Sequence, residues 1–82
     1  MPHLIVKIVE GRTSAIKQAL ANRLTETVMD VLALDAGSVS VAVEEVAPDE
    51  WMRKIYGPDI EAAADRLLKR PGYGPLARSA EG

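Results

Sequence analysis

The strand-like segment near the start of the chain constrains the fold most strongly. His3–Val9 is rich in β-branched residues and apolar on both faces, with Lys7 as the main exception. Two apolar faces are typical of a strand in a parallel sheet that is covered on both sides. The next residues, Glu10-Gly11-Arg12, predict a turn in which Gly11 supplies backbone freedom. This strand therefore needs partners on both of its faces.

A long amphipathic helix is predicted after the turn. Thr13 or Ser14 can cap its first turn, and Asp35-Ala36-Gly37 is expected to end it. Its apolar residues recur at steps of three and four and form one stripe, made of Ile16, Ala19, Leu20, Leu24, Val28, Val31 and Leu32. The alternating residues 39–44 then predict a second strand. Strand, helix and strand make a β-α-β unit, whose crossover should be right-handed.

A second helix is predicted in the C-terminal half of the chain. Residues 48–51 begin a short helical turn or loop, and Gly57-Pro58 is expected to start the helix, because proline suits the first helical position. Pro71-Gly72 should stop it, after an apolar stripe made of Ile60, Ala63, Ala64, Leu67 and Leu68. Residues 73–82 are expected to be a tail that is loosely ordered towards its end. Residues 1–82 should form a single domain of the α/β (α+β) class.

One copy of the chain has too little material to cover the first strand. The chain has 82 residues, with no Phe and no Cys, so its core must use Val, Leu, Ile and Ala, and no disulfide can support it. Two strands and two helices cannot cover both faces of a sheet. We therefore predict a homo-oligomer, in which a second copy supplies the missing cover.

Charge and hydropathy argue against several classes of partner. The net charge is −2, which does not favour a nucleic acid held through its phosphates. The chain has no apolar run long enough to cross a bilayer, and its N-terminus lacks a signal-peptide pattern. The expected setting is the cytoplasm, with neither a nucleic-acid nor a membrane partner.

Proline at the second position points to a specific chemistry. The initiator methionine is usually removed before proline, and its removal would give Pro2 a free secondary amine. An α-amine titrates at about 7.7–8, close to neutrality, so a neutral amine in a pocket is a good general base. In the alternative interpretation, Pro2 simply opens a strand at a position that needs no N–H. A retained Met1 would make the Pro2 nitrogen a non-basic amide.

The order of these features resembles the 4-oxalocrotonate tautomerase family. Met1-Pro2, a strand, Glu10-Gly11-Arg12, a long helix, a second strand and a late aromatic follow one another over nearly the whole chain. Pro48-x-x-Trp51 and Lys69-Arg70-Pro71-Gly72-Tyr73 are similar to the dimeric subgroup, whose members act on enols such as phenylenolpyruvate. The resemblance implies a homodimer in which the two parallel strands of each β-α-β protomer join a partner's two in a four-stranded sheet.

The same resemblance implies the site residues. The family's catalytic amino-terminal proline matches Pro2, its carboxylate-binding arginine matches Arg12, and an aromatic residue that lines the pocket matches Trp51. A second arginine, which some members carry on strand two, is replaced by Ser40. A monocarboxylate enol is therefore expected as substrate rather than a dicarboxylate. Ser40 is itself a candidate to hydrogen-bond substrate.

The implied function is isomerisation of the enol of a small 2-oxo acid to its keto form, without metal or other cofactor. Pro2 would take the enol proton and return it to carbon, while the planar Arg12 fork would bind the carboxylate. Trp51 would exclude water and pack the apolar end of the substrate. His3 adjoins Pro2, but a strand turns its side chain to the opposite face. The alternative is a non-enzymatic ligand-binding or assembly module in which Pro2, Arg12 and Trp51 are structural.

Overall fold

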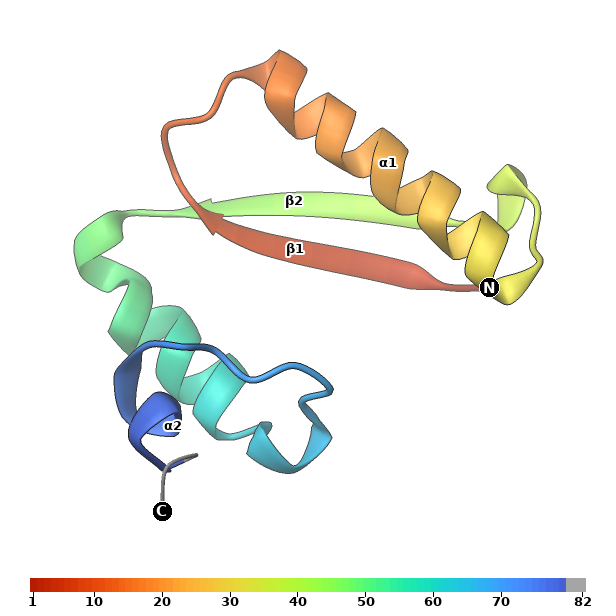
Figure 1. Ribbon diagram of the computed structural model, residues 1–82. Helices are drawn as coiled ribbons and strands as arrows, with labels where there is room; N and C mark the ends of the chain where they lie inside the picture. The colour runs from red at the N-terminus through yellow and green to blue at the C-terminus, as the bar shows by residue number, and fades with distance from the viewer. Residues whose placement is uncertain (80–82) are drawn as a thin grey trace. The chain divides into compact units, whose positions relative to one another are not determined.

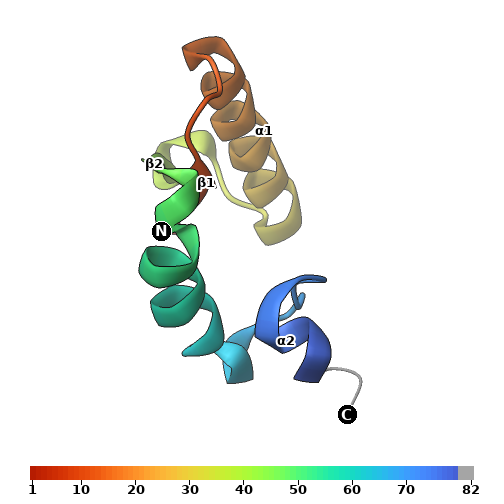
Figure 2. The ribbon, with the colours of Figure 1, turned by 90° about the vertical axis from the view of Figure 1, so that its left-hand side faces the viewer.

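The first half of the chain folds into a strand–helix–strand unit. In the computed structural model, which describes residues 1–79, β1 (His3–Val9), α1 (Ser14–Leu32) and β2 (Ser40–Val46) follow one another. The strands pair in parallel, with His3 opposite Ser40 and Val9 opposite Val46. Figures 1 and 2 show α1 along one face of the two strands. The predicted β-α-β fold class is confirmed.

Both ends of α1 have a clear local cause. Thr13 caps the start, because its hydroxyl accepts a hydrogen bond from the Ile16 N–H at 3.2 Å. The helix ends at Leu32, earlier than the predicted stop at Asp35-Ala36-Gly37. Ala33 ends it by adopting the left-handed conformation, with a φ of 57°. This conformation is costly for alanine, so the sequence carries no signal for it. Asp35 instead precedes a short 3₁₀ turn, η1 (Ala36–Ser38).

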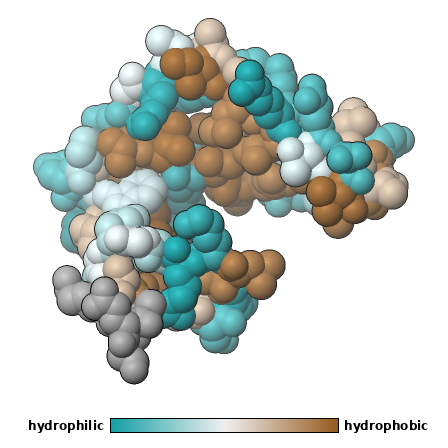
Figure 3. Space-filling view, viewed as in Figure 1, coloured by the Kyte–Doolittle hydropathy of each residue, from teal (hydrophilic) through white to brown (hydrophobic). Residues whose placement is uncertain are grey.

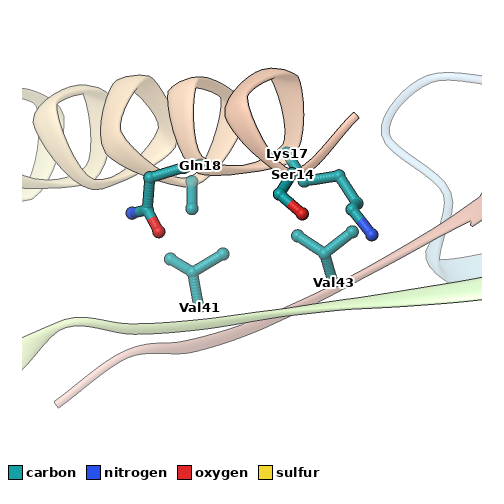
Figure 4. A pocket seen from close by; sticks show the side chains of 6 residues that line it. Ser14, Lys17, Gln18, Val41 and Val43 are labelled. Atoms are coloured by element: carbon teal, nitrogen blue, oxygen red, sulfur yellow. The ribbon is translucent and has the colours of Figure 1, made fainter. Parts of the chain in front are cut away.

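The two faces of the sheet differ in their cover. Val41 and Val43 point from β2 towards α1 (Figure 4) and line a hollow of about 290 Å³, together with Ser14, Lys17, Gln18 and Ala21. Leu4 and Val6 are their partners in the register and share this face. The other face includes Ile5, which is 53% exposed. No residue of Met1–Ala47 is buried, so this unit leaves much apolar surface uncovered (Figure 3).

The second half of the chain forms a separate compact unit, Pro48–Gly82, and its main helix begins earlier than predicted. After a 3₁₀ turn, η2 (Pro48–Glu50), a π-helical segment, η3 (Met52–Glu61), contains Pro58 in its interior. A 3₁₀ turn, η4 (Ala64–Arg66), follows, and residues 67–73 are not helical. The prediction of a helix from Pro58 to Pro71 was therefore wrong in its position. Leu68, which was assigned to the apolar stripe of that helix, is fully exposed.

The π-helical form of η3 has a physical reason in Pro58. Proline offers no N–H, and inside an α-helix its ring collides with the carbonyl four residues earlier. The regular ladder is therefore disturbed at this point, which is where wider π turns occur. Just after the proline, the Ala62 N–H reaches back five residues to the Gly57 carbonyl at 3.1 Å.

Buried side chains gather in this second unit around Tyr56. Ile55, Tyr56 and Leu76 are the buried residues among those described, and Tyr56 is fully buried. The Tyr56 hydroxyl donates to the Tyr73 carbonyl at 2.7 Å and accepts from the Leu76 N–H at 3.1 Å. The rings of Tyr56 and Tyr73 meet edge to face, with centroids 5.1 Å apart. These contacts fasten the C-terminal segment to η3.

The C-terminal segment, residues 73–82, was expected to be a tail that is loosely ordered towards its end. Within it, Gly74–Ser79 form a short helix, α2. The rest of that expectation falls on residues 80–82, which lie outside the described residues. Among residues 1–79, no helix is long and apolar enough to cross a membrane.

Candidate active site

Pro2 lies immediately before β1 and is half-buried. Its ring restricts φ, and its carbonyl accepts a hydrogen bond from the Ser40 N–H at 3.2 Å. The backbone on both sides of the Pro2 Cα is therefore held before any substrate arrives. Met1, whose removal would free the Pro2 amine, is fully exposed at the end of the chain.

Ser40 lies next to Pro2 in the sheet, but its side chain contacts His3. Ser40 Oγ and His3 Nδ1 are 2.6 Å apart, which makes a hydrogen bond between the two strands. His3 and Ser40 are paired in the register, so their side chains share one face of the sheet. Successive strand residues face opposite ways, and Pro2 precedes His3. Within one protomer, the Ser40 hydroxyl is thus directed at His3 and away from the face of Pro2.

Arg12 lies in the turn beyond the other end of β1. Gly11 has a φ of 126°, a conformation that favours glycine, and this allows the chain to turn there. The Glu10 N–H donates to the Val46 carbonyl at 3.0 Å, and Arg12 Nη1 donates to the Val9 carbonyl at 3.2 Å. The Arg12 side chain is exposed. A guanidinium has several N–H donors, so this single bond leaves it able to bind a carboxylate.

An ion pair between α1 and β2 supports the Arg12 turn. Lys17 Nζ lies 2.6 Å from Glu45 Oε1. The hydrogen bond from Lys17 holds the pKa of Glu45 below its ordinary range, and the Gly11 backbone N–H makes a smaller contribution in the same direction. Glu45 is therefore charged at neutral pH, and it links the first turns of α1 to the glycine before Arg12.

One protomer does not bring Pro2 and Arg12 together. They lie beyond opposite ends of β1 (Figure 1), and Pro2 is on the side of the chain start. At about 3.3 Å per residue, this strand holds them roughly 20 Å apart. A small 2-oxo acid is much shorter than that distance. A site that used both residues would combine Pro2 of one copy with Arg12 of another.

Trp51 belongs to the second unit and is half-buried there. Its indole Nε1 donates a hydrogen bond to the Tyr73 hydroxyl at 2.8 Å. The orientation of the predicted pocket residue therefore depends on the C-terminal segment. Sequence reasoning missed this role of Tyr73. Its one signal is the following residue, Gly74, which lets the backbone approach the Tyr56 ring.

Two hollows in the surface of the first unit are lined by other residues than the predicted ones. One is the space under α1 described above, and a second, of about 340 Å³, lies on α1 between Ile16, Ala19, Leu20 and Arg23. Pro2, Arg12, Ser40 and Trp51 line neither of the two. Among residues 1–79, no three His, Cys, Asp or Glu side chains are grouped as metal ligands.

Comparisons with known proteins agree with one another. The family described as tautomerase enzyme matches residues 2–55 of this chain. A probable tautomerase of Xylella fastidiosa is 63% identical over 81 residues, which cover 99% of each chain. Tautomerase PptA of Cronobacter sakazakii is 39% identical over 74 residues, which cover 89% of this chain and 97% of that one. The solved structure of TomN, a 4-oxalocrotonate tautomerase homologue in the tomaymycin biosynthetic pathway, matches with a TM-score of 0.60 at 28% identity, over 78% of this chain and 95% of that one.

Proposed function

This chain belongs to the tautomerase family and is an isomerase, and we propose that it converts the enol of a small 2-oxo acid to the keto form with the Pro2 amine as general base. The observation that carries the proposal is the placement of Pro2 immediately before β1, where the ring and the bond from Ser40 hold its backbone. Family membership also favours this enzyme over the alternative of a non-enzymatic module.

The proposed reaction moves one proton from oxygen to carbon. The neutral Pro2 amine takes the proton of the enol hydroxyl, the C=O bond forms, and the electron pair of the C=C bond accepts the proton that Pro2 returns. Negative charge develops on the substrate oxygen during this transfer and needs nearby positive charge or hydrogen-bond donors. Arg12 supplies such donors while it binds the substrate carboxylate.

The chemistry of Ser40 and Trp51 limits the class of substrate that the proposed site would accept. Ser40 brings no positive charge to the position where some family members carry a second arginine, which favours a monocarboxylate. Trp51 offers a large apolar surface with its N–H already bonded to Tyr73, which suits an apolar or aromatic substrate tail. Phenylenolpyruvate has both features and is the substrate we propose to test first.

The proposed active form is a homodimer with a four-stranded sheet. Two observations support a second copy. The β-α-β unit has no buried residue in a single chain, and its Ile5 face is open. Pro2 and Arg12 are also separated by the length of β1, so a shared substrate requires the two residues to come from different copies.

The decisive experiment compares methionine-free protein with its Pro2→Ala variant in the ultraviolet-monitored ketonisation of phenylenolpyruvate. Loss of the ring amine should lower kcat/KM by about a hundredfold or more. Intact mass spectrometry checks that Met1 is removed from both proteins, and light scattering checks that both have the same oligomeric state. Equal rates for the two proteins, or full activity in a protein that retains Met1, would contradict Pro2 as the base.

A further inference from the structure

We propose that His3 and Ser40 form a clamp that positions the Pro2 amine, so that Ser40 acts through Pro2 and not through contact with substrate. The inference rests on the proposed function, because it assigns a positioning role beside the proposed base. We call this pair the His3–Ser40 clamp. It is built from the side-chain bond between Oγ and Nδ1, at 2.6 Å, and lies next to the backbone bond from Ser40 to Pro2.

Ser40 holds the same short stretch of backbone at two points. Its N–H donates to the carbonyl of Pro2 at 3.2 Å, and its Oγ is bonded to the ring of His3, the next residue. The proline ring already restricts φ, so the orientation of the amine relative to the sheet depends on ψ of Pro2. The bond to the Pro2 carbonyl fixes that torsion. Ser40 thereby controls the remaining freedom of the base.

The side-chain bond is needed because chain ends fray. Once Met1 is removed, Pro2 is the terminal residue, and terminal residues are poorly ordered unless they are tied down. The bond from Ser40 to Pro2 is at the outer end of the β1–β2 pairing. A cross-strand bond between the neighbouring side chains closes this end. A hydroxyl can donate or accept, so it can serve either tautomer of His3 and also the imidazolium.

The clamp and the amine lie on different sides of the strand. The His3 and Ser40 side chains share one face of the sheet, and the alternation of a strand directs Pro2 to the other, the side of Leu4. A substrate that contacts Pro2 therefore need not displace the clamp. A Ser40 that contacted substrate would instead have to leave His3.

The test uses Ser40→Ala in methionine-free protein, with Ser38→Ala as the matched control. Ser38 lies two residues away, and its hydroxyl bonds the Asp35 carbonyl instead. The backbone N–H of residue 40 is present in every variant, so its amide hydrogen exchange directly reports the bond to Pro2. Ser40→Ala should speed this exchange and lower kcat for phenylenolpyruvate, each by roughly two- to tenfold, with KM unchanged. Ser38→Ala should match wild type in all three quantities.

Further variants separate the clamp from a general loss of structure. Ser40→Thr keeps the hydroxyl, and His3→Asn keeps a hydrogen-bonding atom close to the place of Nδ1, so both should retain wild-type exchange and kcat. His3→Ala should behave like Ser40→Ala, and the double variant should be no worse than either single one, because the two residues act as a unit.

Two results would overturn the clamp. One is unchanged exchange at residue 40 in Ser40→Ala, and the other is a raised KM with unchanged kcat, which would make Ser40 a substrate contact. Failure of the proposed function is recognised separately, as an inactive wild-type protein or a fully active Pro2→Ala variant. Either of those results would also remove the catalytic role assigned to the clamp.

Discussion

Gly74 lies so close to the buried ring of Tyr56 that the second unit has no room for a methyl group there. An added Cβ would lie 2.6 Å from Tyr56 Cζ, and Gly74 also has a φ of 72°. Gly74→Ala should therefore lower the free energy of unfolding of this unit by about 2–4 kcal/mol, from the overlap and from backbone strain. Urea unfolding measures this loss. Gly72→Ala is the control, because nothing lies within 4 Å of its added Cβ, and it should change stability by less than about 0.5 kcal/mol. Equal effects of the two would contradict the packing around Tyr56.

At the scale of elements, the Lys17–Glu45 ion pair that joins α1 to β2 should make stability depend on pH. The pKa of Glu45 is lowered in the folded state, so the unfolded state binds more protons as the pH falls. The stabilisation by this ion pair is present above the ordinary carboxyl pKa, and it is lost as the pH falls through the lowered pKa of Glu45. Lys17→Met should therefore be less stable than wild type at pH 7, with a smaller difference at pH 3. Urea unfolding at both pH values tests this, with Glu45→Gln as the background in which Lys17→Met should show no such dependence.

The elements also show how far the sequence could predict the fold. The strands and α1 were predictable, because β-branched runs and a single apolar stripe fix their type, and Thr13 was a recognisable cap. The end of α1 was not, because Ala33 takes a left-handed conformation that alanine rarely adopts. The predicted start of the second helix at Pro58 was also wrong. Proline normally marks a helix start, whereas here Pro58 lies inside η3, where the Ala62 N–H bonds the Gly57 carbonyl in the wider π pattern.

At the scale of the whole molecule, the separation of Pro2 and Arg12 predicts that two damaged copies can restore one site. Pro2→Ala and Arg12→Ala should each be nearly inactive alone. In a symmetric dimer that shares its sites, half of the chains refolded from an equal mixture would form heterodimers, each with one intact site. The mixture should therefore regain about a quarter of wild-type activity. Activity no higher than that of the separate variants would contradict a site built from two copies.

The site illustrates what a single sequence can and cannot predict. Family resemblance identified Pro2, Arg12, Trp51 and Ser40 as candidates, and their roles remain proposals. It gave no sign that Ser40 would bond His3, because that contact depends on the register between β1 and β2. It also gave no sign of the bond from Trp51 to Tyr73, which joins residues far apart in the chain. Such contacts follow from tertiary pairing, which local patterns do not specify.

The distribution of aromatic residues gives the molecule a built-in pair of optical probes. The chain has one Trp, two Tyr and no Phe, and these three aromatic residues, Trp51, Tyr56 and Tyr73, all lie in the second unit. The aromatic fluorescence and absorbance therefore arise in Pro48–Gly82, whereas the far-ultraviolet circular dichroism sums the helices and strands of both units, including α1, β1 and β2. Unfolding curves recorded with both signals coincide if the two units melt as one cooperative system, and separate if each melts by itself.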